Sequence, residues 1–152
     1  MPEAEVLRAY RFTLDPTPAQ EANLARHAGA ARWAFNHALA AKVAAHEQWR
    51  TAVAELVAQG IPEEEARKKA RVPIPTKPDI QKAFNQVKGD SRTGTDGLCP
   101  WSHEVNTHCF QSAFLDADAA WKNWLDSLTG KRAGRKVGYP RFKKKGRSRD
   151  SF

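Results

Sequence analysis

The sequence predicts an α+β fold that is mainly α, with a helical block between one strand near each end of the chain. Polar and apolar residues alternate over residues 6–14, which indicates the first strand. Helix-capping residues and apolar stripes recur through residues 16–130. A basic segment bounded by Gly and Pro, with interspersed aromatic residues, indicates a second strand at a sheet edge over residues 138–146. If the two strands pair, the helical block is an insertion between neighbours of one sheet.

The N-terminal strand is predicted from a period of two. In "VLRAYRFTL", one face consists of Val6, Arg8, Tyr10, Phe12 and Leu14. Aromatic and β-branched residues at every second position are typical of a strand. The following "DPTPAQ" ends the strand and begins a helix, because Thr17 suits an N-cap, Pro18 suits the first helical position and Gln20 completes a capping box.

Glycines and caps divide the central block into helices. We expect one helix over residues 18–28, an interruption at Gly29 and a second helix over residues 30–58. Two short helices should follow, one opening at Pro62 and one over residues 76–88. Each boundary carries a Pro, Gly or Thr, which are the residues that begin or end helices.

The last helix is predicted over residues 102–128, with Ser102 as its cap and Gly130 just past its end. At 100° per residue its apolar side chains gather on one arc, formed by Val105, Cys109, Phe110, Ala113, Phe114, Ala117, Trp121, Trp124 and Leu128. His108 and Gln111 fall on the opposite face. The arc should therefore face the core, and these two polar residues should face solvent or a ligand.

Positive charge is concentrated at the C-terminus. The chain has 152 residues and a net charge of +8. Residues 131–152 hold ten Lys and Arg residues and one acid, Asp150, and so carry +9, while residues 1–130 carry −1. Such a block attracts phosphate by counterion release. Tyr139, Phe142 and Phe152 favour nucleic-acid contact over the alternative of a solvated, disordered tail.

No catalytic or metal site is predicted. The Cys and His residues of positions 99–109 match no standard zinc spacing, and His103 and His108 lie about 140° apart on a helix. Asp116 and Asp118 lie about 200° apart, on different faces. The chain contains no nucleophile elbow and no phosphate-binding loop. We therefore expect no enzyme activity, no cofactor and no metal.

The sequence also bears on location. No run of 18 apolar residues is present, and "MPEAEVLRAY" lacks the pattern of a signal peptide. Two cysteines do not make a disulfide framework. These features predict a cytoplasmic protein without a membrane partner.

Residues 18–45 offer an alternative interpretation as a DNA-reading helix-turn-helix. A turn at Gly29 is shorter than such motifs use, and the second helix offers DNA only Arg32, His37 and Lys42. A helical hairpin that packs is therefore preferred. Trp33 lies off the apolar stripe, so it could stack on a base or dock on the strand.

Three segments in order resemble one family. "AYRFTLDPTPAQEANLARHAGAARWAFNHALAAK" is similar to the N-terminal signature of TnpB (OrfB) proteins of insertion sequences, which are RNA-guided nucleases related to compact type V CRISPR effectors. "PWSHEVNTHCFQSAFLDADAAWKNW" and "GYPRFKKKGRSRDSF" are similar to later segments of that family. The matching positions include Tyr10, Phe12, Pro16, Thr17, Gly29, Arg32, Asn36, Trp101, Glu104, Gln111, Gly138, Pro140, Phe142, Lys143, Ser151 and Phe152. Asp15 and Phe35 depart from the pattern, which usually has aromatic residues at these positions, Tyr at the second.

The resemblance implies an incomplete wedge-type β-barrel that carries a helical recognition insertion. Residues 1–15 would be its first strand, residues 16–130 the insertion and residues 131–152 a basic return strand. Family members continue into a RuvC-like nuclease with metal-binding acids and a zinc ribbon. The chain is therefore expected to be a truncated reading frame or one half of a split one, with a separately encoded RuvC-like half as a partner.

The implied function is binding of guide-type RNA and double-stranded DNA without cleavage. The expected contacts are basic residues near both ends and two polar residues of the last helix: Arg8, Arg11, His108, Gln111, Lys136, Arg141, Lys143, Lys144, Lys145 and Arg147. In the resembling proteins the start of this helix faces the short DNA motif beside the target, and a Gln there can bond N6 and N7 of adenine. Two alternatives remain, a conventional helix-turn-helix DNA-binding protein and a helical interaction module or non-functional remnant.

Overall fold

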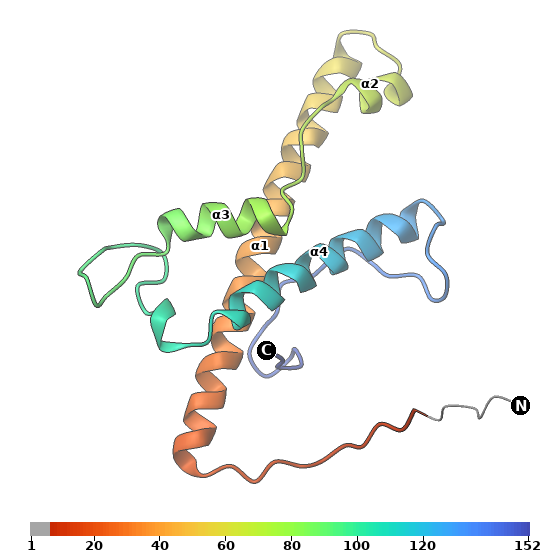
Figure 1. Ribbon diagram of the computed structural model, residues 1–152. Coiled ribbons are helices and arrows are strands. Elements are labelled where there is room, and N and C mark those ends of the chain that lie inside the picture. Colours follow the sequence, from red (N-terminus) through yellow and green to blue (C-terminus); the bar gives the residue numbers. More distant parts are fainter. Residues whose placement is uncertain (1–6) are drawn as a thin grey trace, which may run out of the picture.

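The computed structural model describes residues 7–152, so Val6 of the predicted first strand lies outside the described residues. Figure 1 shows a long helix crossed by a second one, with two shorter helices beside them. The elements in chain order are α1 (Pro18–Ala58), α2 (Glu63–Lys69), α3 (Lys77–Val87), the 3-10 turn η1 (Ser102–Glu104) and α4 (His108–Leu128). No helix of this described part is long and apolar enough to cross a membrane.

The predicted α+β fold is wrong, because residues 7–152 form no strand and no sheet beyond an isolated bridge between Asp90 and Thr95. Residues 7–17 are extended, but the side chains of Tyr10 and Phe12 are 72% and 83% exposed. Residues 138–146 pack on helices instead of pairing with that segment. A strand is stable only beside another strand, so alternation alone does not make a sheet. The wedge-type barrel is therefore not formed in the described chain.

α1 is one continuous helix of 41 residues, without the predicted break at Gly29. Its predicted capping box is confirmed: the Thr17 backbone N–H donates to Gln20 Oε1 at 2.9 Å, and the Gln20 N–H donates to Thr17 Oγ1 at 3.4 Å. A glycine within a helix costs about 1 kcal/mol relative to alanine. Burial of Ala28, Ala30 and the following alanines against neighbouring elements favours the helix through this point. The helix ends before Gly60, as predicted.

α4 begins at His108 and not at Ser102, because η1 and an extended Val105 precede it. Its predicted apolar arc is otherwise confirmed, since six of its residues are buried: Cys109, Phe110, Ala113, Phe114, Ala117 and Trp121. Leu128 is the exception on this arc, with 65% of its side chain exposed. Leu128 is the last residue of α4, whose C-terminal end lies beyond the crossing with α1 (Figure 1).

The core lies where α1, α3 and α4 meet. Alanines line the α1 face, with Ala34 and Ala38 fully buried, so α4 can approach closely. Phe84 of α3 stacks on Phe110 at 5.0 Å between ring centroids. Trp33 packs against Phe84 at 5.8 Å and belongs to this aromatic core, so it is docked on helices and not on a strand.

A buried ion pair joins three elements. Lys42 of α1 is 3% exposed, and its Nζ lies 2.6 Å from Asp118 Oδ1 of α4. The same Nζ donates to the Pro75 carbonyl at 2.6 Å, and Asp118 Oδ2 accepts from the Lys77 N–H at 2.8 Å. These contacts hold the first turn of α3 against both long helices.

Candidate nucleic-acid interface

The basic arm, residues 131–152, folds back over α4 and then crosses α1 (Figure 1). Gly130 and Gly134 adopt positive φ angles of 72° and 92°, which only glycine adopts readily, so the chain reverses here. The Val137 N–H then donates to Ser127 Oγ at 3.0 Å. The arm is therefore seated on the helices from its beginning.

Aromatic packing holds the middle of the basic arm. The Tyr139 ring lies edge-on to Trp124 at 4.7 Å and to Trp121 at 5.7 Å between centroids. Burial raises the pKa of the Tyr139 hydroxyl above its usual value. Edge-to-face pairs of this kind contribute roughly 0.5–1.5 kcal/mol beyond the area that they bury.

Asn36 of α1 holds the next part of the arm through its side-chain amide. The Lys143 N–H donates to Asn36 Oδ1 at 2.7 Å, and Asn36 Nδ2 donates to the Lys143 carbonyl at 3.0 Å. The amide thus satisfies both backbone groups of Lys143, as a neighbouring strand would. The Lys143 ammonium consequently lies 4.5 Å from the centre of the Phe35 ring, in a cation–π contact.

A closed turn follows and turns its side chains outward. The Lys144 N–H donates to Ser148 Oγ at 2.9 Å, and the Ser148 N–H donates to the Lys144 carbonyl at 3.0 Å. Gly146 occupies a positive φ of 75° within this turn. Lys144, Lys145 and Arg147 are all exposed there.

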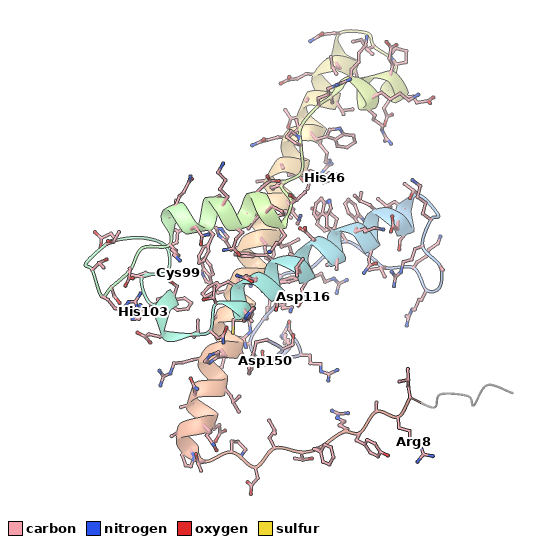
Figure 2. All side chains as sticks on the ribbon, in the orientation of Figure 1. Arg8, His46, Cys99, His103, Asp116 and Asp150 are labelled. Carbon is pink, nitrogen blue, oxygen red and sulfur yellow. The ribbon has the colours of Figure 1, made fainter. Side chains whose placement is uncertain are left out.

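The end of the arm rests on the N-terminal half of α1. Arg32 Nη2 lies 2.6 Å from Asp150 Oδ1, and the Phe152 ring is 5.6 Å from the His27 ring. Figure 2 shows Asp150 beside the crossing of α1 and α4. Asp150, the last acid of the chain, therefore attaches the arm to α1 through its ion pair with Arg32.

Six of the predicted contact residues lie on the basic arm, and we name them the arm cations: Lys136, Arg141, Lys143, Lys144, Lys145 and Arg147. Within residues 7–152 none of the arm cations forms an ion pair. Five of them are exposed, and Lys143 is half-buried over Phe35. Their charge is therefore available to phosphate groups.

The other four predicted contact residues lie elsewhere. Arg8 and Arg11 are exposed on the extended N-terminal segment, and Figure 2 shows Arg8 away from the helices. His108 is exposed and Gln111 is half-buried in the first turn of α4. No hydrogen bond or ion pair joins these four residues to the arm cations in the described chain, although Lys143 and Ser112 of α4 line the same hollow.

The face of α1 that a DNA-reading helix would use is already occupied. Arg32 pairs with Asp150, Lys42 is buried with Asp118, and the His37 ring stacks on Trp33 at 4.9 Å. Lys42 is therefore not available to DNA, and Arg32 and His37 are engaged in contacts within the chain. The sequence did not identify these three residues, or Asn36, as residues that hold the arm and the core. For Arg32 and Asn36, the match to the family pattern was a signal that could have done so.

Both cysteines of the described chain belong to its packed core. Cys99 and Cys109 are buried in the core, and burial raises the pKa of the Cys99 thiol to about 11. Residues 7–152 contain no group of three or more His, Cys, Asp or Glu side chains placed to hold a metal ion. Both thiols are therefore kept protonated by burial in the apolar core.

Comparison with known proteins agrees with the resemblance in the sequence. Residues 1–51 match the family model of the OrfB helix-turn-helix domain of the IS605 type. Two Mycobacterium tuberculosis proteins, from strains CDC 1551/Oshkosh and ATCC 25618/H37Rv, are each named "Putative RNA-guided DNA endonuclease" and are 38% identical over 150 residues. The match covers 99% of this chain but 29% of each relative.

Within the family match, residues 18–51 lie in the single helix α1, so here the domain has no turn between two helices. The chain spans about 29% of the length of the curated relatives that it matches, and the match covers 99% of this chain and is not limited to residues 1–51. The resemblance predicted from the sequence is thereby confirmed: residues 1–51 match the helix-turn-helix domain of the OrfB family, and nearly the whole chain is similar to part of two proteins named putative RNA-guided DNA endonucleases.

Proposed function

We propose that the chain binds the backbones of a guide-type RNA and of double-stranded DNA, and that it does not cleave nucleic acid by itself. One observation carries the proposal: within residues 7–152 the arm cations form no ion pair, and the arm is held in a defined conformation on α1 and α4. A cationic surface ordered before binding spends less conformational entropy on association than a disordered tail does.

The arm cations suit contact with phosphates more than with base edges. Lys144, Lys145 and Arg147 project from a short turn and are not aligned along one helix that enters a major groove. Neutralising backbone phosphates releases counterions, which gives affinity without sequence preference and with a strong dependence on salt. This chemistry fits an element that holds nucleic acid while another part reads its sequence.

The first turn of α4 supplies a candidate for sequence reading. Gln111 and His108 share the first turn of α4, and neither belongs to the seated arm. A glutamine there can bond N6 and N7 of one adenine in a major groove. Arg8 and Arg11, exposed on the extended segment, would add backbone contacts on a separate path.

The names of the relatives support RNA and DNA as ligands, since both are called RNA-guided DNA endonucleases. Two-metal cleavage of DNA needs clustered carboxylates, and residues 7–152 offer no such cluster. We therefore assign the nuclease chemistry to the portion of the relatives that this chain does not match. A RuvC-like half that carries this chemistry would be the partner of this chain.

The test is the salt dependence of binding. Arg141, Lys143, Lys144 and Lys145 are changed together to Ala, and a matched variant loses the same charge from Lys68, Lys69, Arg71 and Lys82, two of which are paired with glutamates. Fluorescence anisotropy with an RNA hairpin and a DNA duplex is measured across a salt series. The arm variant should lower the slope of log affinity against log salt by up to about four on DNA and by less on single-stranded RNA. Equal slopes for wild type and arm variant would refute the proposal.

The helix-turn-helix alternative is not favoured by any contact. A DNA-reading helix needs free polar side chains along one face, and α1 uses Arg32 and Lys42 inside the molecule. An interaction module that binds no nucleic acid would show no salt-dependent RNA or DNA binding at all, so the same anisotropy series separates it.

A further inference from the structure

We propose that a groove beside Trp49 binds one unpaired base of single-stranded RNA; this rests on the proposed RNA binding by the arm. The groove lies between the C-terminal half of α1, α2 and the C-terminal half of α4. It consists of two adjoining hollows of about 420 and 370 Å³, and His46, Trp49 and Arg67 line both of them. Each volume falls within the range of roughly 300–1,000 Å³ typical of small-ligand sites.

The walls of the groove are aromatic and apolar. The His46 and Trp49 rings are stacked, with centroids 5.6 Å apart and planes 14° apart. The His46 ring also meets Trp121 and Trp124 edge-on, at 5.7 and 5.4 Å between centroids, and these rings continue the lining together with Leu125 and Leu128. Leu128 is 65% exposed, so apolar surface is open at the mouth of the groove. Flat apolar walls of this kind offer stacking surfaces for a planar ring.

The charge around the groove points to an anionic ligand. The chain that leaves α4 next to Leu128 carries Lys131, Arg132, Arg135 and Lys136, and residues 127–149 contain no acid. Arg67, on the α2 wall, is paired with Glu63, so the excess positive charge comes from the arm. A ligand with a flat aromatic ring and a negatively charged link on either side fits both features, and a nucleotide within a single strand has that chemistry.

Continuity with the arm favours RNA as the source of this base. Trp124 lines the groove and also packs on Tyr139 of the basic arm, so the two surfaces form one structure. We expect a strand held by the arm cations to reach the groove where Tyr139 packs on Trp124. A base in a duplex has both faces covered by its neighbours, and only an unpaired base can insert and stack on a protein ring.

The test compares two RNAs of equal charge. One is a single strand of about 12 nucleotides, and the other has the same backbone with abasic positions in place of its central bases. Wild-type protein should bind the intact strand more tightly. Trp49→Leu should abolish that preference, a loss of about tenfold to a hundredfold in affinity for the intact strand, which is the contribution of one stacked base. Trp49→Phe keeps a ring and should retain most of the preference.

Control variants and ligands separate the outcomes. Leu115→Ala, an exposed leucine on another face of α4, should change nothing. Leu128→Glu alters an exposed position, so it should reduce the preference without unfolding the chain, and circular dichroism checks the helicity of each variant. Affinity for duplex RNA should be unchanged by Trp49→Leu.

Three results would overturn the inference. Trp49→Leu and Leu128→Glu could leave the preference for the intact strand unchanged, wild type could bind intact and abasic strands equally, or the effect could appear with single-stranded DNA alone. In each of these cases the salt dependence of the arm can still hold, so the proposed function survives. Absence of RNA binding by wild type would refute both.

Discussion

The side-chain amide of Asn36 pairs with the backbone of Lys143 across 107 positions of sequence, through hydrogen bonds of 2.7 and 3.0 Å. This pair converts the basic arm from a charged tail into part of the folded structure. Because both backbone groups of Lys143 are satisfied, the neighbouring lysines can point to solvent without leaving buried polar groups unpaired. Four predictions follow from this and the other contacts.

Asn36→Ala should release the centre of the arm. Two hydrogen bonds are lost, each contributing about 0.5–1.5 kcal/mol, so the free energy of unfolding should fall by about 1–3 kcal/mol. Hydrogen exchange at the Lys143 amide should become fast. Asn36→Asp is the matched control, because a carboxylate still accepts from the Lys143 N–H but cannot donate to its carbonyl. Equal protection of this amide in wild type and Asn36→Ala would contradict the pairing.

Lys42→Met should destabilise the chain strongly, because Asp118 would lose its buried cationic partner. Removing one member of a buried pair costs about 3–5 kcal/mol, and the 30% exposure of Asp118 places the expected cost near about 3 kcal/mol. Lys122→Met removes the cation of an i,i+4 pair with Asp126, in which the Lys122 side chain is 74% exposed, and should cost less than about 0.5 kcal/mol. Urea unfolding measures both. Similar losses for the two variants would show that burial of the Lys42 pair is unimportant.

Stability should decrease as the pH falls from about 8 to about 5. Burial lowers the pKa of His37, and burial is also the main cause that lowers the pKa of His46. The unfolded chain therefore binds more protons than the folded chain, so stability is complete above the unfolded histidine pKa of about 6.5 and is lost as the pH falls through the folded values.

The measurement is the thermal midpoint across this pH range. His37→Phe keeps a ring stacked on Trp33 but removes the titratable imidazole, so the thermal midpoint of this variant should depend less steeply on pH than that of wild type. Asp90 does not contribute in this window, because hydrogen bonds from Arg92 lower its carboxyl pKa to about 2. A midpoint independent of pH between about 8 and 5 would be inconsistent with this account.

Gln111→Ala should relax the DNA motif preference at one base pair by about 1–3 kcal/mol. The measurement is a randomised-motif binding or cleavage screen with the chain fused to the nuclease half of a homologue. Lys144→Ala, which removes a backbone contact, should instead weaken all sequences alike. An unchanged motif profile for a folded Gln111→Ala variant would assign Gln111 to the ordinary surface.

Several features followed from the sequence because they depend on residues close together in the chain. The capping box at Thr17 joins residues three positions apart. The apolar arc of α4 repeats every three or four residues, and the charge of residues 131–152 is a property of composition. Local hydrogen bonds and periodicity are readable from sequence, since the helix itself sets the spacing.

Tertiary structure decided the rest, because the deciding contacts join distant positions. The alternation of residues 7–14 describes a strand, but a strand needs a partner and the described chain provides none. Gly29 has the local preference of a helix end, yet burial of the flanking alanines keeps α1 continuous. The sequence alone left Lys42 available to DNA, but in the fold its Nζ lies 2.6 Å from Oδ1 of Asp118, which is 76 positions later in the chain. The sequence by itself determined the cap at Thr17 and the place of the charge. Only packing determined that Asn36, Tyr139 and Asp150 hold that charge on α1 and α4, since such contacts form between segments that the fold, and not the chain order, makes neighbours.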